Sequence, residues 1–219
     1  MTVQDIQNSA GSTPRVFQEI VTVSGTIGED ITQIILNSSL AQMTVHLPDP
    51  SLPGKQMRVR NISTGTLGEH TLQCTGGDFE GVNTTMSIPP YAEVLLSSVG
   101  SQTWRVSEVR RGYIEFGVAL GAFPKPAPGC GLDILLTRVA GATAGTLPAF
   151  GAGDVGSNIT IAQTSTQAHT VLSFSPPRIN GSSGTVTLGT QVGSSVDLIV
   201  NSTGTMYSRN LQGNGAAVS

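Results

Sequence analysis

The residues of this chain that could do chemistry are few, and three of them are histidines. His46 alternates with Val45 and Leu47, which predicts that its side chain faces solvent from a β-strand. His70 and His169 each come just before a β-favouring run, and neither is followed by a second histidine or a carboxylate at the i+2 or i+4 spacing of a metal site. We therefore expect structural roles for these two, such as a hydrogen bond to a turn carbonyl, and no bound metal.

Two cysteines, Cys74 and Cys130, are too few for a structural zinc site or a disulfide framework. Free cysteine behaves as a small hydrophobic residue. The sequence favours two buried free thiols, with a bridge between them as the alternative.

The few matches to catalytic or cofactor-binding motifs have better structural explanations. Asp78 and Glu80 flank Phe79 and could act as an acid–base pair on a sugar, although a solvated turn explains them better. The G-x-G-x-x-G match at 151–156 runs into the strand pattern at 157–161 instead of the helix that a dinucleotide site requires. No G-x-S-x-G elbow is present. We expect a protein that is not an enzyme and binds no cofactor.

The chain contains few charged residues, and this limits the classes of partner that it could bind. Of 219 residues, 11 are Lys or Arg and 14 are Asp or Glu, giving a net charge of −3. The only basic doublet is Arg110-Arg111, which argues against a nucleic-acid partner. No apolar run reaches the roughly 18 residues of a membrane helix, and the first residues do not resemble a secretory signal. We expect a soluble protein made without a cleaved export signal, with no membrane partner.

The charge becomes scarcest near the end of the chain. From Val139 onward the only charged residues are Asp154, Arg178, Asp197 and Arg209. Two explanations stand side by side: compositional drift in a Gly/Thr-rich β domain, or a surface that neighbouring subunits cover.

The elements that must position these residues are short β-strands. Alternating or apolar runs bounded by Asn, Ser, Pro or Gly recur about every ten residues, the pattern of a β-sandwich or barrel. Examples are 33–36, 43–47, 57–60, 94–96, 104–106, 113–116, 158–161, 170–172 and 196–200. We predict an all-β protein with antiparallel sheets.

The chain also repeats itself. The segment LPDPSLPGKQMRVRNIST begins at Leu47, and LPAFGAGDVGSNITIAQTST begins at Leu147, about 100 residues later. His169 follows His70 at a similar offset, and Tyr207 follows Trp104. The spacing predicts two tandem β domains related by internal duplication, at 18–110 and 113–212. Residues 1–17 form an extended, flexible N-terminal arm in this interpretation, and residues 213–219 form a loose tail.

Three aromatic residues are candidates for stacking on a sugar: Tyr91, Trp104 and Tyr207. A lone tryptophan on a strand more often anchors its own sheet, and we favour that role for Trp104.

The pattern around the first repeat resembles a β module of tailed-bacteriophage structural proteins, which include head-decoration, head-fibre and tail-fibre proteins. The module runs from Leu-Pro through a Gly-Lys loop to a strand ending in Asn, then to an apolar strand, a Gly turn and Trp. The matching positions here are Leu47, Pro48, Gly54, Lys55, Asn61, Gly100 and Trp104. The second half keeps only Leu147, Pro148 and Gly156 of these.

The resemblance implies a virion protein made in the host cytoplasm. The leading hypothesis is a capsid-decoration (cement) protein on the exterior of the head. Its partners would be the major capsid protein and further copies of itself, as a trimer or alternatively a dimer. The arm is the expected capsid contact, because disordered arms often fold on binding. Its candidate contact residues are Thr2, Val3, Ile6, Pro14, Arg15 and Phe17. The alternative is a fibre adhesin that holds a host surface glycan through the three aromatic residues above.

Overall fold

A computed structural model describes residues 2–6, 16–64, 68–172, 179–180, 185–201, 205–213 and 217–218. The chain divides into two compact units, Met1–Arg110 (unit 1) and Arg111–Ser219 (unit 2). Both are built from strands, which confirms the all-β prediction. Among the described residues no helix is long or apolar enough to span a membrane.

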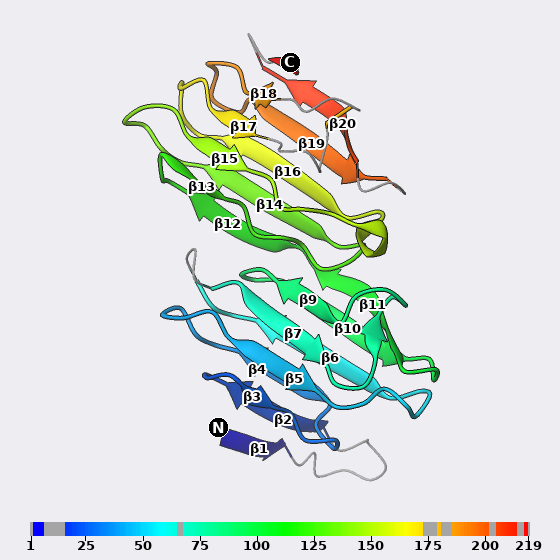
Figure 1. The fold of residues 1–219 in the computed structure, drawn as a ribbon. Coiled ribbons are helices and arrows are strands. Elements are labelled where there is room, and N and C mark those ends of the chain that lie inside the picture. Colours follow the sequence, from blue (N-terminus) through cyan, green and yellow to red (C-terminus); the bar gives the residue numbers. More distant parts are fainter. Residues whose placement is uncertain are drawn as a thin grey trace. The chain divides into compact units, whose positions relative to one another are not determined.

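Unit 1 consists of two sheets (Figure 1). Sheet A has the strand order β1-β2-β4-β6-β10-β11-β8, and sheet B has the order β3-β5-β7-β9. The strands are β1 (Thr2–Ile6), β2 (Val16–Val21), β3 (Gly25–Thr26), β4 (Gln33–Leu36), β5 (Thr44–Leu47), β6 (Gln56–Asn61), β7 (His70–Cys74), β8 (Asp78–Phe79), β9 (Thr85–Ile88), β10 (Glu93–Ser98) and β11 (Thr103–Arg110).

Unit 2 also consists of two sheets. Sheet C has the order β12-β14-β16-β19-β20, and sheet D has the order β13-β15-β17-β18-β21. The elements are β12 (Gly112–Phe116), β13 (Leu120–Ala122), β14 (Gly131–Leu136), β15 (Ala144–Thr146), the 3₁₀ turn η1 (Ala152–Asp154), β16 (Asn158–Gln163), β17 (Thr170–Leu172), β18 (Thr185–Thr187), β19 (Ser195–Val200), β20 (Met206–Gln212) and β21 (Ala217–Val218).

The chain crosses from one sheet to the other after almost every strand in the first half of each unit. Because a strand of the opposite sheet separates them, β2, β4 and β6 run parallel in sheet A, and β3, β5 and β7 run parallel in sheet B. The last strands of the unit then return antiparallel, β9 on β7, β10 on β6 and β11 on β10. Each unit is therefore a short coil of strands closed by antiparallel strands.

The prediction of antiparallel sheets was wrong for the coiled part. Unit 2 shows the same parallel pairs: β12 with β14, β14 with β16, β13 with β15, and β15 with β17. Parallel neighbours require a long crossover connection, and here the strand of the opposite sheet is that crossover. A turn signal every ten residues marks where a strand ends, but it does not say which sheet receives the next strand.

The two units share one order of strands and pairings. Strands β2 to β7 of unit 1 correspond to β12 to β17 of unit 2, and β9, β10 and β11 correspond to β18, β19 and β20. Equivalent turns also carry equivalent residues: Gly54 and Gly156 both adopt a left-handed φ, +85° and +84°, which glycine accepts without a Cβ clash. Common topology is what a duplication would leave, and the duplication itself stays a prediction.

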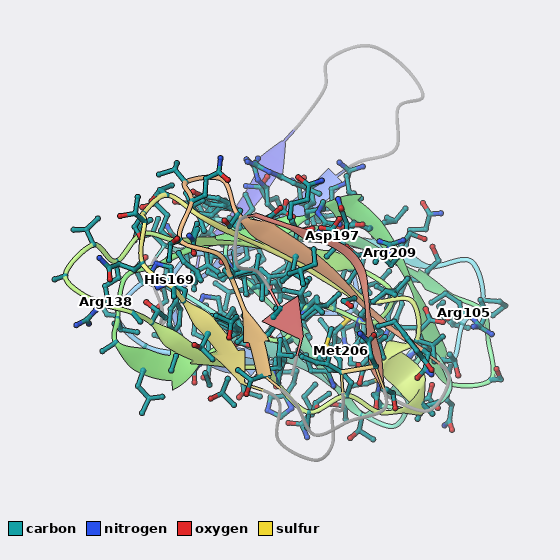
Figure 2. The ribbon with its side chains drawn as sticks, turned by 90° about the horizontal axis from the view of Figure 1, so that it is seen from above. Arg105, Arg138, His169, Asp197, Met206 and Arg209 are labelled. Carbon is teal, nitrogen blue, oxygen red and sulfur yellow. The ribbon has the colours of Figure 1, made fainter. Side chains whose placement is uncertain are left out.

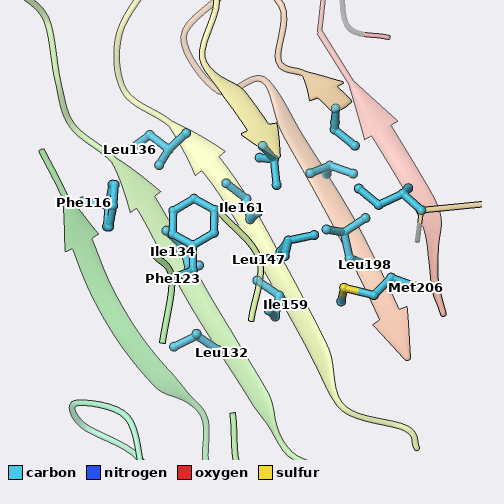
Figure 3. Close-up of a cluster of buried hydrophobic side chains, with 14 of the residues drawn as sticks. Phe116, Phe123, Leu132, Ile134, Leu136, Leu147, Ile159, Ile161, Leu198 and Met206 are labelled. Carbon is cyan, nitrogen blue, oxygen red and sulfur yellow. The ribbon is translucent and has the colours of Figure 1, made fainter. Parts of the chain in front are cut away.

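Each unit encloses its own apolar core between its two sheets. Strand alternation sends every second side chain inward, as in β16 and β19, whose inward residues are fully buried. Figure 3 shows the core of unit 2, where Phe116 and Phe123 meet edge to face with centroids 4.9 Å apart. The ring of Phe123 occupies the space that a Cβ on Gly145 would need, so β15 can carry only glycine there. Unit 1 buries Trp104, Phe79, Leu72 and Leu96 in the same way.

Candidate functional site

His70 is the centre of a closed polar network at one end of unit 1. Its side chain is fully buried, its Nδ1 accepts the backbone N–H of Met43 at 3.2 Å, and its Nε2 lies 2.8 Å from Ser63 Oγ. Ser63 Oγ also accepts the N–H of Ser38 at 2.8 Å and donates to the carbonyl of Leu36 at 3.4 Å. The ring thus ties the turn before β5 to the turn before β7.

His169 repeats this arrangement in unit 2. The ring is again fully buried, Nδ1 accepts the N–H of Thr143 at 2.8 Å, and Nε2 lies 2.7 Å from Ser165 Oγ. Thr143 Oγ1 donates to the carbonyl of Val118 at 2.9 Å and so adds the preceding turn to the network. Figure 2 shows His169 and Arg138 at the same end of unit 2.

The geometry fixes the chemical state of both rings. A backbone N–H can only donate, so Nδ1 must be unprotonated, and the proton of the neutral ring resides on Nε2. Nε2–H then donates to the serine, the reverse of the transfer that would activate a serine nucleophile. Burial lowers the pKa of His70, and burial together with the cation of Arg138 lowers the pKa of His169. The expected structural role is confirmed, and Nδ1 of each ring accepts a backbone N–H.

An amide side chain stands beside each histidine network. Asn61 Nδ2 donates to the carbonyls of Gly68 and Ile88 at 2.6 and 2.9 Å. Gln163, at the end of the equivalent strand β16, donates from Nε2 to the carbonyls of Ser165 and Gly189, the latter at 2.5 Å. Buried turn carbonyls need such donors, since a buried carbonyl without a partner costs about 1–3 kcal/mol.

The carboxylates of Asp78 and Glu80 hold backbone in place. Asp78 Oδ1 accepts the N–H of Gly81 at 2.9 Å. Glu80, with φ 57°, accepts the N–H of Val106 at 2.5 Å and pairs with Arg105 at 2.9 Å. Both carboxylates thus stabilise the turn and the strand edge beside it, which agrees with the turn interpretation.

Unit 2 repeats the Glu80 contact with an amide. Asn180, with φ 51°, accepts the N–H of Ser208 at Oδ1 and donates from Nδ2 to Ser208 Oγ, at 3.1 and 2.9 Å. In both units this left-handed residue covers the outer edge of the last long strand of the sheet. An uncovered edge is a template for pairing with another chain.

The candidate aromatic residues differ in exposure. Trp104 has no exposed surface, so it anchors the core and cannot stack on a glycan. Its counterpart in the pairing pattern is Met206, because Trp104 pairs with Ser98 where Met206 pairs with Val200. The alignment of Tyr207 with Trp104 was therefore wrong by one residue. One residue along a strand exchanges the inner face for the outer one, and Tyr207 is accordingly 46% exposed.

Tyr91 lies in the turn between β9 and β10, half-buried and with φ 62°. Tyr207 lies on the outer face of sheet C opposite Ile199. The two occupy different units, and Trp104 is buried, so the three candidates do not share one exposed surface.

The arm residues fall in two groups. Thr2, Val3 and Ile6 belong to β1, which pairs antiparallel with β2 as the outermost strand of sheet A. Phe17 belongs to β2, where its carbonyl accepts the N–H of Thr32 at 3.0 Å. Pro14 and Arg15 lie outside the described residues.

The G-x-G-x-x-G segment contains the 3₁₀ turn η1, and the chain then enters β16 as a strand, as expected. Its Asp154 is buried, accepts the N–H of Gly151 at 2.7 Å and pairs with Lys125 at 2.6 Å. Lys125 Nζ also lies 5.6 Å from the centroid of the Phe150 ring. The loop thus carries a structural ion pair.

The cysteines were predicted to be buried free thiols. Cys74 and Cys130 are free and buried, as expected. Burial, then the charges of Asp49 and Asp78, raise the pKa of Cys74 to about 11, which keeps it a thiol at neutral pH. Within the described part of the chain, no three His, Cys, Asp or Glu side chains come together as a metal site would require.

Charge is distributed unevenly between the sheets, which the sequence alone did not reveal. Every Asp, Glu, Lys and Arg in a described strand belongs to sheet A or sheet C, and the strands of sheets B and D contain none. Sheet D instead presents two outward rows of uncharged residues, most of them small. One row contains Leu120, Ala144, Thr170, Thr187 and Ala217, and the other includes Ala122, Thr146 and Thr185.

Sheet B is similar, with Thr44, Thr71 and Ser87 in one outward row and Thr26, His46, Gln73 and Thr85 in the other. His46 is half-buried in this row, on the outer face as the sequence predicted. The outer faces of sheets A and C carry ion pairs, such as Arg58 with Glu93 and Arg111 with Asp133, at 2.9 and 2.8 Å.

Comparisons with known proteins add little to this description. No protein-family model matches the chain, and no curated protein matches it. A solved structure described as "Structure of a chaperone-substrate complex" is similar at a TM-score of 0.44 and 12% sequence identity. The similarity covers 87% of this chain and 36% of that one, and at this level it carries no argument about function.

Proposed function

We propose that this chain is a non-enzymatic structural subunit of a virion, a capsid-decoration protein that binds the outside of a tailed-phage head. The observation that carries the proposal is the segregation of charge, which leaves sheets B and D with uncharged outer faces. The segment between Leu47 and Trp104 resembles phage structural modules, and this resemblance is the reason for proposing a phage head as the assembly.

An uncharged sheet face suits a contact between proteins. The cores of protein interfaces are depleted of charged residues, because stripping water from a charge costs more than pairing regains. Threonine and alanine rows offer methyl groups for packing and hydroxyl groups for hydrogen bonds at little desolvation cost. The scarcity of charge after Val139 then reflects covering by a neighbouring subunit more than compositional drift.

In this proposal the subunits form a closed homo-oligomer, with a trimer expected and a dimer as the alternative. The uncharged faces contact neighbouring copies, and the arm with β1 contacts the major capsid protein. Binding only to the assembled lattice would stabilise the shell by mass action.

The experiment is co-sedimentation with heads that lack this protein, combined with sedimentation equilibrium of the free protein. The full chain should bind heads saturably, and a chain that begins at Gln18 should bind more weakly. Thr71→Lys and Thr170→Lys place a charge on sheets B and D and should reduce self-association. Ala162→Lys places the same charge on the outer face of sheet C, where the wild type is half-buried, and should leave self-association unchanged. Failure of the full chain to bind heads would overturn the decoration role.

The second candidate, a fibre adhesin, depends on Tyr207. With Trp104 buried, Tyr207 is the strongly exposed aromatic residue of the three candidates. Glycan-array binding that Tyr207→Ala abolishes and Tyr91→Ala leaves intact would favour the adhesin over the decoration protein.

A further inference from the structure

Each unit closes one end with a neutral histidine that has no free ring nitrogen. Nδ1 of His70 is occupied by the N–H of Met43, and Nδ1 of His169 by the N–H of Thr143. A second proton can enter the ring only at Nδ1. There it would face the hydrogen of a backbone N–H, which carries a partial positive charge, so the two would repel. Protonation therefore breaks this hydrogen bond in either unit.

In unit 1 the surroundings compensate the resulting cation only in part. The turn from 37 to 43 contains no charged residue, the chain just before β7 contributes Glu69, and the turn from 89 to 92 contributes Tyr91 as its titratable group. Glu69 Oε1 accepts a hydrogen bond from Ser87 Oγ. Backbone hydrogen bonds with Glu69 and Ser38 favour the charged ring, but burial outweighs them and lowers the pKa of His70.

In unit 2 the surroundings oppose the cation. The turn from 137 to 143 carries Arg138, whose charge acts against protonation of His169. The turns from 164 to 169 and from 188 to 194 contain no charged residue. A ring held in the closed network therefore resists protonation, whereas a ring released to water titrates near its usual pKa of about 6.5.

We propose that His70 and His169 are matched acid-sensitive latches, which hold the turns 37–43 and 137–143 at neutral pH and release them on mild acidification. Among the residues whose burial is described, these turns carry the most exposed large apolar residue of each unit, Leu40 at 91% and Val139 at 72%. Release gives each unit a second arrangement of these loops while its sheets stay folded. The inference stands whether or not the chain decorates a capsid.

The sign and size of the effect follow from proton linkage. The open form binds one more proton than the closed form below the usual histidine pKa, so opening becomes easier as pH falls and is independent of pH above it. For an open-state pKa of about 6.5, the opening constant rises by about 30-fold between pH 8 and pH 5. The rise ends only where the closed ring itself takes up a proton.

Hydrogen exchange at single amides of the full chain tests this directly. After correction for intrinsic rates, the protection of the Met43 and Thr143 amides should fall by about 30-fold from pH 8 to pH 5. The amides of Val59 and Ile161, inside the central strands β6 and β16, should change little. Unchanged protection at Met43 and Thr143 would overturn the proposal, and so would an equal loss at all four amides, which is global unfolding.

Substitutions separate the two latches. His70→Gln keeps an acceptor and a donor but cannot titrate, so the pH dependence should vanish at Met43 and persist at Thr143, and His169→Gln should give the converse. His46→Gln, on the outer face of sheet B, should leave both intact. If a glutamine variant does not fold, the ¹⁵N shifts of the wild-type rings decide: protonated Nε2 with bare Nδ1 supports the latches, and the other tautomer overturns them.

Discussion

At the scale of single residues, the hydroxyl of Ser63 in the histidine network of unit 1 uses all of its hydrogen-bonding capacity. Ser63 Oγ receives the ring Nε2–H and the N–H of Ser38 and gives its own proton to Leu36. A polar cluster of this kind is stable only while every member has a partner, because water cannot reach those that lose one.

Ser63→Ala should therefore destabilise unit 1 by about 1–3 kcal/mol, since it leaves the buried ring N–H of His70 and the half-buried N–H of Ser38 without their acceptor. The measurement is urea unfolding followed by the fluorescence of Trp104, the one tryptophan of the chain. Ser39→Ala is the control, because its hydroxyl bonds to Thr64 in an exposed position, and it should change stability by less than about 0.5 kcal/mol. Equal effects of the two substitutions would contradict the account of the network.

Arg138 provides a prediction about pH. Arg138→Gln removes the cation that helps to lower the pKa of His169, so that pKa should rise and the stability of unit 2 should be lost over a smaller pH range. The depressed pKa means that the unfolded ring binds protons first, so stability is complete above about pH 6.5 and falls below it. Histidine ¹H–¹⁵N titration measures the change, and the pKa of His70 should not move. If the pKa of His169 is the same in Arg138→Gln as in the wild type, burial alone lowers it.

At the scale of elements, the closing strands of both units depend on one left-handed residue. Glu80 and Asn180 have little in common except a side-chain oxygen and a backbone that turns through positive φ, yet each accepts an N–H from the last long strand of its sheet. Asparagine tolerates this conformation better than glutamate does. The two side chains therefore make the same contact with the strand edge, but the left-handed backbone is more strained at Glu80 than at Asn180.

Asparagine, the residue of unit 2 at this position, should be able to replace Glu80 in unit 1. Glu80→Asn should change the stability of unit 1 by less than about 1 kcal/mol, because the lost ion pair with Arg105 is exposed and the backbone strain falls. Glu80→Ala should cost about 1–2 kcal/mol, because the N–H of Val106 loses its partner. Urea unfolding followed by Trp104 fluorescence compares the variants. An alanine variant as stable as the asparagine variant would show that the edge contact contributes nothing.

At the scale of the whole molecule, each unit has its own core and the same order of strands. A domain of about 110 residues can bury enough apolar surface to fold alone. The buried side chains of unit 2 form a continuous cluster from Ile114 to Met206 within the unit's own limits. The two units therefore satisfy the requirements of separate domains.

Chains of residues 1–110 and 111–219, produced separately, should each fold. Each should show a strand-type circular dichroism spectrum and one cooperative urea transition, and Trp104 in the first should emit as it does in the full chain. An unfolded fragment would show that its stability depends on the other unit.

The sequence alone determined the strands, because alternation of buried and exposed residues along a strand is a local property. It also identified His70 and His169 as equivalent structural residues and the cysteines as buried free thiols. The parallel pairing, the backbone partners of the histidines and the match of Trp104 with Met206 depended on the tertiary structure. So did the segregation of charge, because the chain visits the two sheets of a unit in turn, and charges that are mixed along the sequence are sorted only when alternate strands join different sheets.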